Sequence, residues 1–260
     1  MWNAFDEEVV RRKSSAAAPI GVLEFVRTRL GFFPDAQQTG VLESTASQGI
    51  LNCSRQWGKS TVSAAKALHR AFSVPGSLVL VASPGERQSA EWMRKARDMA
   101  LRLGFGLRGD GDNKISLLLP NRSRIVGLPG MDGTVRGFSS VSLLLIDEAA
   151  RVEDSMYKAL RPMLAVSDGD VWLMSTPYGR RGFFYEAWEH GGEDWYRLHG
   201  PATDCPRISR AFLEKERGVM GALAFRQEYL GEFVDCGTGL FERGLVEAAL
   251  DDAVEPLRFQ

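Results

Sequence analysis

NCSRQWGKST, residues 52–61, joins an apolar segment typical of a buried strand to a segment with the periodicity of a helix. Gly58, Lys59 and Ser60 match the end of the pattern G-x-x-x-x-G-K-[ST], whereas Cys53 replaces its first glycine. In such a loop, backbone amides at the helix start bind phosphate, the lysine contacts the outer phosphates, and the hydroxyl binds Mg²⁺. The segment therefore predicts a phosphate-binding loop.

A second motif, LLLIDE at residues 143–148, places two carboxylates at the end of an apolar run. The carboxyl ends of parallel strands lie at the sheet edge where ligands bind. We expect Asp147 to hold Mg²⁺, directly or through water, and Glu148 to orient and deprotonate an attacking water molecule. Acids favoured by the dipole at a helix N-terminus are the alternative. The phosphate-binding loop upstream favours the catalytic interpretation.

Short apolar runs alternate with longer amphipathic segments along much of the chain. This alternation predicts an α/β fold with a mostly parallel sheet and helices on both faces. A hairpin is expected at residues 114–128, with its turn at Asn121 and Arg122. The other expected strands are residues 49–54, 77–82, 141–146 and 170–174, and the expected helices are residues 59–72, 86–103 and 153–164.

Changes in composition divide the chain into three expected regions. Residues 1–30 predict an N-terminal helical arm or a lid subdomain over the nucleotide. Residues 31–235 are the expected P-loop core. Residues 236–260, which are rich in acids, are expected to form a C-terminal linker.

The overall composition is that of a globular protein, with 260 residues, 44% hydrophobic and 25% charged, which excludes disordered and collagen-like chains. The formal net charge is -1, so contact with nucleic acid depends on a local basic patch. The three scattered cysteines form no CxxC pair and fit a reducing cytosol. Since the sequence has no signal-peptide core and no apolar run of membrane-spanning length, we expect no membrane contact.

Two further positions carry polar side chains suited to a nucleotide. Ser175 and Thr176 follow the expected strand at residues 170–174, where hydroxyls can sense the γ-phosphate; ordinary turn residues are the alternative. The amide of Gln38 can both donate to and accept from the edge of adenine. Gln37 is the rival candidate, and a surface glutamine is the simpler alternative.

Together, Gln38 and the segments SRQWGKST (54–61), LLLIDEAA (143–150) and STPYG (175–179) resemble the ATPase half of phage terminase large subunits. The resemblance covers roughly residues 20–241 and includes FRQEYLGEF (225–233). It implies a P-loop NTPase of the ASCE, RecA-like type that uses ATP and Mg²⁺ to translocate double-stranded DNA into a procapsid. The implied partners are a homo-oligomeric ring on the capsid portal and a small terminase subunit, at the portal vertex in the host cytoplasm.

The resemblance also assigns roles to single residues. It implies phosphate and Mg²⁺ binding by Lys59 and Ser60, metal binding by Asp147, and the role of catalytic base for Glu148. The expected nucleotide-binding residues are Gln38, Ser54, Arg55, Gln56, Trp57, Gly58, Lys59, Ser60 and Thr61.

Two arginines compete for contact with the transferred phosphoryl group. Arg136, in GTVRGF (133–138), is implied to be an arginine finger for the ATP of a neighbouring subunit; a structural arginine in a glycine-rich loop is the alternative. Arg55 is the competing candidate, since the family commonly carries an arginine within the loop and tolerates a residue such as Cys53 at its start. By the same resemblance, Ser175 and Thr176 fall in the motif that couples hydrolysis to movement.

A basic segment is the candidate DNA contact. Residues 87–108 contain six bases and two acids, a surplus that suits phosphate contacts without base readout; a solvated helix face is the alternative. Proteins of the resembled family continue into a nuclease domain, toward which residues 236–260 are expected to lead. No acid cluster of that kind is evident, so we expect no nuclease activity from this sequence. The DNA-binding candidates are Arg94, Lys95, Arg97 and Arg102.

Two other functions are compatible with these motifs. A fragment of a two-lobed, superfamily-2-like helicase shares them, but the residues that follow Thr176 are too few for a second lobe. A nucleotide-binding assembly module with little hydrolysis is the other alternative. Glu148 argues against it, because a protein that only binds nucleotide needs no base beside Asp147.

Overall fold

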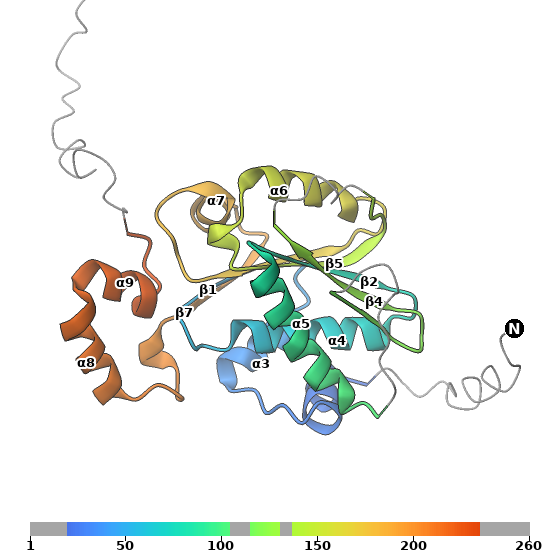
Figure 1. Ribbon diagram of the computed structural model, residues 1–260, viewed down its shortest axis with the longest axis horizontal. Coiled ribbons are helices and arrows are strands. Elements are labelled where there is room, and N and C mark those ends of the chain that lie inside the picture. Colours follow the sequence, from blue (N-terminus) through green and yellow to red (C-terminus); the bar gives the residue numbers. More distant parts are fainter. Residues whose placement is uncertain (1–19, 105–114, 131–136, 235–260) are drawn as a thin grey trace, which may run out of the picture.

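The computed structural model describes residues 20–104, 115–130 and 137–234. Within these ranges a seven-stranded sheet has the order β3-β4-β2-β5-β6-β1-β7 (Figure 1). All neighbouring strands run parallel except β3 and β4, which form the expected antiparallel hairpin, so the predicted α/β class is confirmed. The strands are β1 (Gln48–Cys53), β2 (Leu78–Ser83), β3 (Ser116–Leu118), β4 (Arg124–Pro129), β5 (Val141–Asp147), β6 (Asp170–Ser175) and β7 (Trp195–Gly200).

Helices cover both faces of the sheet (Figure 1). One layer contains α2 (Val22–Glu24) with its π-helical continuation Phe25–Arg29, α3 (Ala36–Glu43), α4 (Lys59–Ser73) and α5 (Glu86–Leu101). The opposite layer contains α6 (Asp154–Leu160) and α7 (Gly182–His190). Successive strand residues serve opposite layers: Leu51 packs with α4, whereas Ile50 packs with α6 and α7. Burial on both faces explains why the central strands are almost continuously apolar.

The N-terminal helical segment belongs to the core, which corrects the expected lid for the part of it that the structure describes. Phe25 is fully buried and packs against His69 and Phe72, with ring centroids 5.4 Å and 4.9 Å away. His69 lies ten residues beyond Lys59 on α4, and this spacing corresponds to about 15 Å along the helix. Residues 20–30 therefore pack at the end of α4 remote from the loop, while residues 1–19 lie outside the described ranges.

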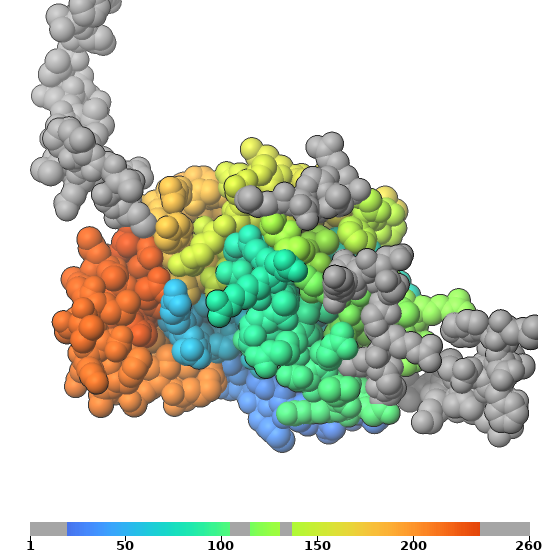
Figure 2. All heavy atoms as spheres, in the orientation of Figure 1, coloured from blue at the N-terminus to red at the C-terminus, as the bar shows by residue number. Residues whose placement is uncertain are grey.

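Several elements differ from expectation, and helices α3 and α7 were not predicted. The helix expected at residues 153–164 ends as α-helix at Leu160 and continues as a 3₁₀ turn, Arg161–Leu164, which contains Pro162. Strand β7 was not predicted, and neither was the pair α8 (Arg210–Met220) and α9 (Ala222–Leu230) beyond it. This pair forms a separate lobe at one end of the molecule, coloured orange in Figure 2, around the small cluster of Ala202, Leu213 and Phe225.

No helix among the described residues is both long enough and apolar enough to cross a bilayer.

Candidate nucleotide-binding site

The loop between β1 and α4 is fixed by its own backbone and by two distant elements. Gln56 and Gly58 adopt left-handed conformations, with φ of 62° and 102°. The amide of Ser54 donates to the carbonyl of Gly200 at 2.9 Å, and the amide of Arg55 donates to the carbonyl of Glu228 at 3.2 Å. The end of β7 and helix α9 therefore hold the first half of the loop. Gly58 is required twice over, because of its φ and because a Cβ there would lie 2.9 Å from the Gln38 amide nitrogen.

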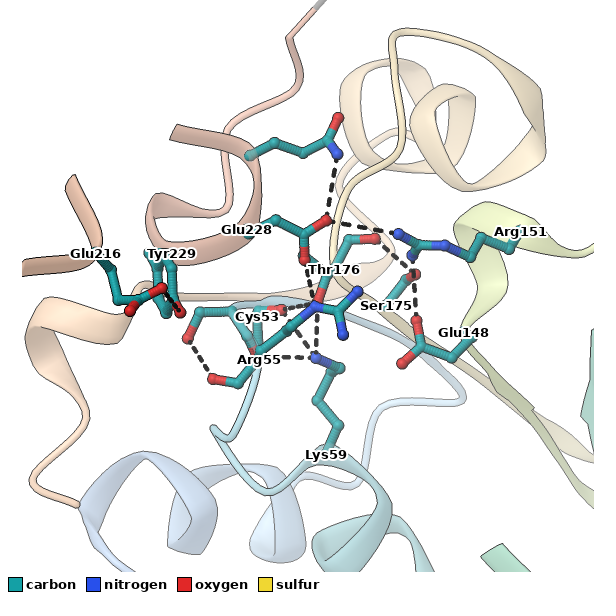
Figure 3. Close-up of polar contacts among 12 residues, drawn as sticks. Cys53, Arg55, Lys59, Glu148, Arg151, Ser175, Thr176, Glu216, Glu228 and Tyr229 are labelled. Atoms are coloured by element: carbon teal, nitrogen blue, oxygen red, sulfur yellow. Dashed lines mark hydrogen bonds and ion pairs between the residues drawn. The ribbon is translucent and has the colours of Figure 1, made fainter. Parts of the chain in front are cut away.

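Lys59 opens α4 and is 7% exposed. Its ammonium donates to the carbonyls of Cys53 and Ser54, both at 2.9 Å, and to the hydroxyl of Thr176 at 3.1 Å (Figure 3). Burial lowers the pKa of Lys59, an effect that the negative charges of Glu148 and Asp147 oppose. Thr176, the predicted coupling residue, is therefore in direct contact with the loop lysine. Its hydroxyl also donates to the Cys53 carbonyl at 3.1 Å.

Asp147, at the end of β5, faces the start of α4. The Ser60 hydroxyl donates to its Oδ2 at 3.4 Å, while its Oδ1 is buried without a hydrogen-bond partner among the described residues. Burial, reinforced by the negative charge of Glu148, raises the pKa of Asp147 to about 6, against the effect of Lys59.

A magnesium ion fits these two side chains. An unsatisfied carboxylate oxygen beside a hydroxyl is a donor set that suits a hard cation. No group of three His, Cys, Asp or Glu side chains capable of holding a metal occurs in the described ranges. The pair formed by Ser60 and Asp147 suits Mg²⁺, because this ion takes few protein ligands and coordinates mainly waters and nucleotide phosphates.

Glu148 follows with a left-handed backbone, φ 52°, which is rare outside glycine and costs about 1 kcal/mol or more. Its carboxylate accepts from Arg151 Nη1 at 3.3 Å. Arg151 in turn lies 3.7 Å from Glu228 of α9, and Glu228 also pairs with Arg55 of the loop (Figure 3). A chain of alternating charges thus links the expected catalytic base to α9.

The cavity above the loop has a volume of about 420 Å³. Its lining contains five cations and one acid, so it is suited to a polyanion. The lining residues are Arg55, Gln56, Gly58, Lys59, Ser60, Thr61, Lys95, Glu148, Arg151, Thr176 and Arg207.

Gln38 lies beneath the loop and is not among the residues that line this cavity, so its contact with adenine stays a prediction. The side chain is 3% exposed, its Oε1 accepts from the Asp35 amide at 3.2 Å, and its Nε2 donates to the Trp57 carbonyl at 3.1 Å. The rival, Gln37, accepts from the Trp57 indole at 2.8 Å. Both glutamines therefore support the loop from below.

Three other expected residues lie behind the cavity. Ser54 and Ser175 are fully buried, and their hydroxyls donate to the carbonyls of Arg55 at 3.3 Å and Thr176 at 2.7 Å. Trp57 is also fully buried and belongs to the core. Arg136, the expected arginine finger, lies outside the described residues.

The structure separates the four candidate DNA-binding residues. Arg94 and Arg97 are exposed on α5, and Arg94 pairs with Glu91 at 2.7 Å. Arg102 donates to the Leu30 carbonyl at 2.7 Å and so anchors the N-terminal segment. Lys95 lines the cavity above the loop, and DNA contact by these residues stays a prediction.

Sequence reasoning missed Arg151, Arg207 and Glu228. Arg207 donates to Asp35 at 2.7 Å and to the Trp57 carbonyl at 2.5 Å, so it braces the loop from the other side. None of the three belongs to a motif. The only available signal was Glu228 within the stretch at residues 225–233.

A parallel sheet with this loop after β1, and with an Asp-Glu pair ending β5, defines a P-loop NTPase domain of the RecA-like type. The chain belongs to the family described as terminase large subunit, T4likevirus-type, N-terminal, whose model matches residues 50–247.

Two curated relatives and two solved structures agree with this family. The terminase large subunit of Thermus virus P23-45 is 26% identical over 247 residues, covering 82% of this chain and 51% of the relative. That of Escherichia phage T5 is 26% identical over 216 residues, covering 78% and 48%. The chain thus spans about half the length of the curated relatives it matches.

The solved structures show the same fold. The large terminase ATPase domain of Thermus phage P74-26 matches with a TM-score of 0.72 at 25% identity, over 84% of this chain and 100% of that one. The large terminase of thermophilic bacteriophage D6E, in complex with ATP-gamma-S, matches with a TM-score of 0.65 at 16% identity, over 76% and 52%.

Proposed function

We propose that this chain is the ATPase motor domain of a DNA-packaging terminase, which hydrolyses ATP in the presence of Mg²⁺ to move double-stranded DNA into a procapsid. One observation carries the proposal: Lys59, Ser60 and Glu148 line one cationic cavity although they come from two distant segments, and the buried Asp147 accepts from the Ser60 hydroxyl beside it. Membership of the terminase family and the ATP-gamma-S complex of the D6E relative support it.

In this proposal the loop amides and Lys59 bind the phosphates. Ser60 and Asp147 would hold Mg²⁺, which when bound would supply neutralisation of the phosphate charge. Glu148 accepts the proton of the attacking water as its oxygen bonds to the γ-phosphorus and the bond to the β–γ bridging oxygen breaks. Arg55, which is exposed, lines the cavity and pairs with Glu228, is proposed to stabilise the charge on the transferred group.

Coupling to movement is proposed for Thr176 and Ser175. The Lys59 ammonium donates to the Thr176 hydroxyl as well as to the carbonyls of Cys53 and Ser54. When Lys59 turns to a phosphate oxygen, Thr176 loses one hydrogen-bond partner, and the segment after β6 can respond. Ser175, buried behind it, donates to the Thr176 carbonyl and so ties the two residues together.

The wider assembly is also part of the proposal. A homo-oligomeric ring on the capsid portal, a small terminase subunit and double-stranded DNA are the proposed partners, at the portal vertex in the host cytoplasm. Residues 31–235 are proposed as the motor core, which the buried N-terminal segment at residues 20–30 extends. Residues 236–260 stay a predicted linker.

The direct test is steady-state ATP hydrolysis by the wild type and by Glu148→Gln, each with and without duplex DNA. Removing a general base is expected to lower the rate about 10²–10⁴-fold. Nucleotide affinity, measured separately, should change little, because the amide keeps the size of the side chain. Glu189→Gln, on the exposed side of α7, is the matched control. Equal rates in the wild type and Glu148→Gln, with nucleotide bound to both, would instead indicate an assembly module.

A further inference from the structure

Lys95 differs from the other cations of the cavity in its origin and in its partners. It comes from α5, which carries none of the motif residues. The other four cations are held by protein acceptors: Lys59 by carbonyls, Arg55 and Arg151 by Glu228, and Arg207 by Asp35. No hydrogen bond or ion pair holds the Lys95 ammonium within the described ranges, so it is free to bind a ligand in the cavity.

Packing fixes this lysine beside the phosphate-binding loop. Trp92, one helical turn earlier on α5, is 1% exposed, and its indole donates to the Ser63 hydroxyl of α4 at 2.9 Å. Ser63 donates to the Ser60 carbonyl at 3.2 Å. Because α5 is tied in this way to the first turn of α4, the stem of Lys95 has a defined position relative to Ser60.

The position of Lys95 identifies the end of the cavity that it serves. It lines the same cavity as Ser60, to which its helix is tied through Trp92 and Ser63, and the Ser60 hydroxyl donates to Asp147. Asp147 and Ser60 mark the proposed metal position, which in a nucleoside triphosphate lies between the β- and γ-phosphates. Lys59, by contrast, is anchored among the loop carbonyls at the start of α4.

We propose that Lys95 binds the terminal phosphate of a nucleoside triphosphate from the α5 side of the cavity, and thereby distinguishes a triphosphate from a diphosphate. The proposal rests on the proposed nucleotide site. A flexible ammonium with three donors suits a phosphate group that is present in one ligand and absent in the other.

Equilibrium binding of ATP-gamma-S and of ADP, each with Mg²⁺ at one fixed salt concentration, tests this. The variants are Lys95→Ala, Lys95→Arg and the control Arg87→Ala, an exposed cation on α5 that does not line the cavity. We expect Lys95→Ala to weaken ATP-gamma-S binding about 10-fold or more and ADP binding less than about 3-fold, because a hydrogen bond to a charged group is lost for the triphosphate alone. Lys95→Arg should restore much of the discrimination, and Arg87→Ala should leave both affinities unchanged.

Each contrary result has a distinct meaning. Equal losses for the two nucleotides would overturn the terminal-phosphate contact. If Lys95→Ala left both nucleotide affinities unchanged but weakened binding of duplex DNA, Lys95 would contact DNA and the proposal would be overturned. A wild type that binds neither nucleotide would overturn the proposed function itself. Thermal melting of each variant identifies any loss caused by unfolding, and Lys95→Arg keeps the test valid where Lys95→Ala is unstable.

Discussion

Asp147 is a buried carboxylate whose surroundings disfavour its negative charge. The carboxyl is 6% exposed, and one of its oxygens has no hydrogen-bond partner among the described residues. Burial and the neighbouring Glu148 raise its pKa from 3.8 to about 6. The folded chain therefore holds the Asp147 proton more tightly than the unfolded chain does, and ionising this group in the folded protein costs stability.

This shift predicts how stability depends on pH in the presence of a metal chelator. Between about pH 4 and pH 6 the unfolded chain has released a proton that folded Asp147 retains, so its contribution makes the free energy of unfolding fall as pH rises. The variant Asp147→Asn should not show this fall. Its free energy of unfolding at pH 8 should exceed that of the wild type by up to about 3 kcal/mol. Denaturant titrations of both proteins from pH 4 to pH 8 measure it. Parallel pH profiles would contradict the shift.

The residues of the site that belong to sequence motifs were predictable. The residues that reach the site only through tertiary contacts were not. Lys59, Ser60 and Asp147 meet as expected, because a loop after one parallel strand and an acid after another reach the same sheet edge. Arg151 lies on the 3₁₀ turn Ala149–Arg151 after β5 and Glu228 lies on α9, and the two come together through tertiary packing that leaves no local pattern. The contact of Gln38 with the loop backbone was not predicted either, because it joins residues that are 19 positions apart.

At the scale of elements, β7 is the one strand in the described part of the chain that was not predicted. In WYRLHG, at residues 195–200, only the end positions are buried, so the segment lacks the apolar run that revealed the other strands. Its parallel pairing with β1 nevertheless brings the Gly200 carbonyl to the loop amide of Ser54. An edge strand of mixed composition thus determines the start of the phosphate-binding loop.

Gly200→Ala tests this dependence. A Cβ at this position would lie 2.7 Å from the Trp57 indole nitrogen and 2.8 Å from the Cys53 sulfur, so the loop has to shift. We expect the free energy of unfolding to fall by about 1–3 kcal/mol, as for other overpacked cores, and nucleotide affinity to fall with it. Calorimetric melting and nucleotide titration provide the measurements. Gly218→Ala, exposed on α8 with nothing within 4 Å of the added carbon, is the control and should not destabilise; an equally stable Gly200→Ala would refute the role of this contact.

At the scale of the whole molecule, the class of the sheet was predictable but the order of its strands was not. Alternating apolar and amphipathic segments predict a parallel sheet, whereas the placement of β6 between β1 and β5 depends on contacts between distant residues. This order separates the loop strand from the Asp147 strand by one strand. The cavity between them is completed by α5 and by the segment after β6.

The proposed ring makes activity depend on protein concentration. If Arg136 acts on the ATP of a neighbouring subunit, the hydrolysis rate per subunit should rise as subunits associate. We expect Arg136→Ala to abolish that rise without changing nucleotide affinity, whereas Arg55→Ala should lower the rate at every concentration. Hydrolysis measured over a wide range of protein concentrations distinguishes the two. A rate per subunit that ignores concentration and survives Arg136→Ala would exclude the trans contact.

The phosphate-binding loop lies where two cooperative units of unequal stability meet. Strand β1 has parallel neighbours on both sides, so its local unfolding requires two ladders to break, whereas α8 and α9 contribute only Leu213 and Phe225 to a small buried cluster. Detaching α9 costs the ion pairs of Glu228 with Arg55 and Arg151 and one backbone hydrogen bond to the loop, together with the contacts of Leu230 and Gly231 to His199 and Asn52. We expect hydrogen exchange to be faster in α8 and α9 than in β1, so that local opening releases Arg55 from Glu228 while Lys59 keeps its position.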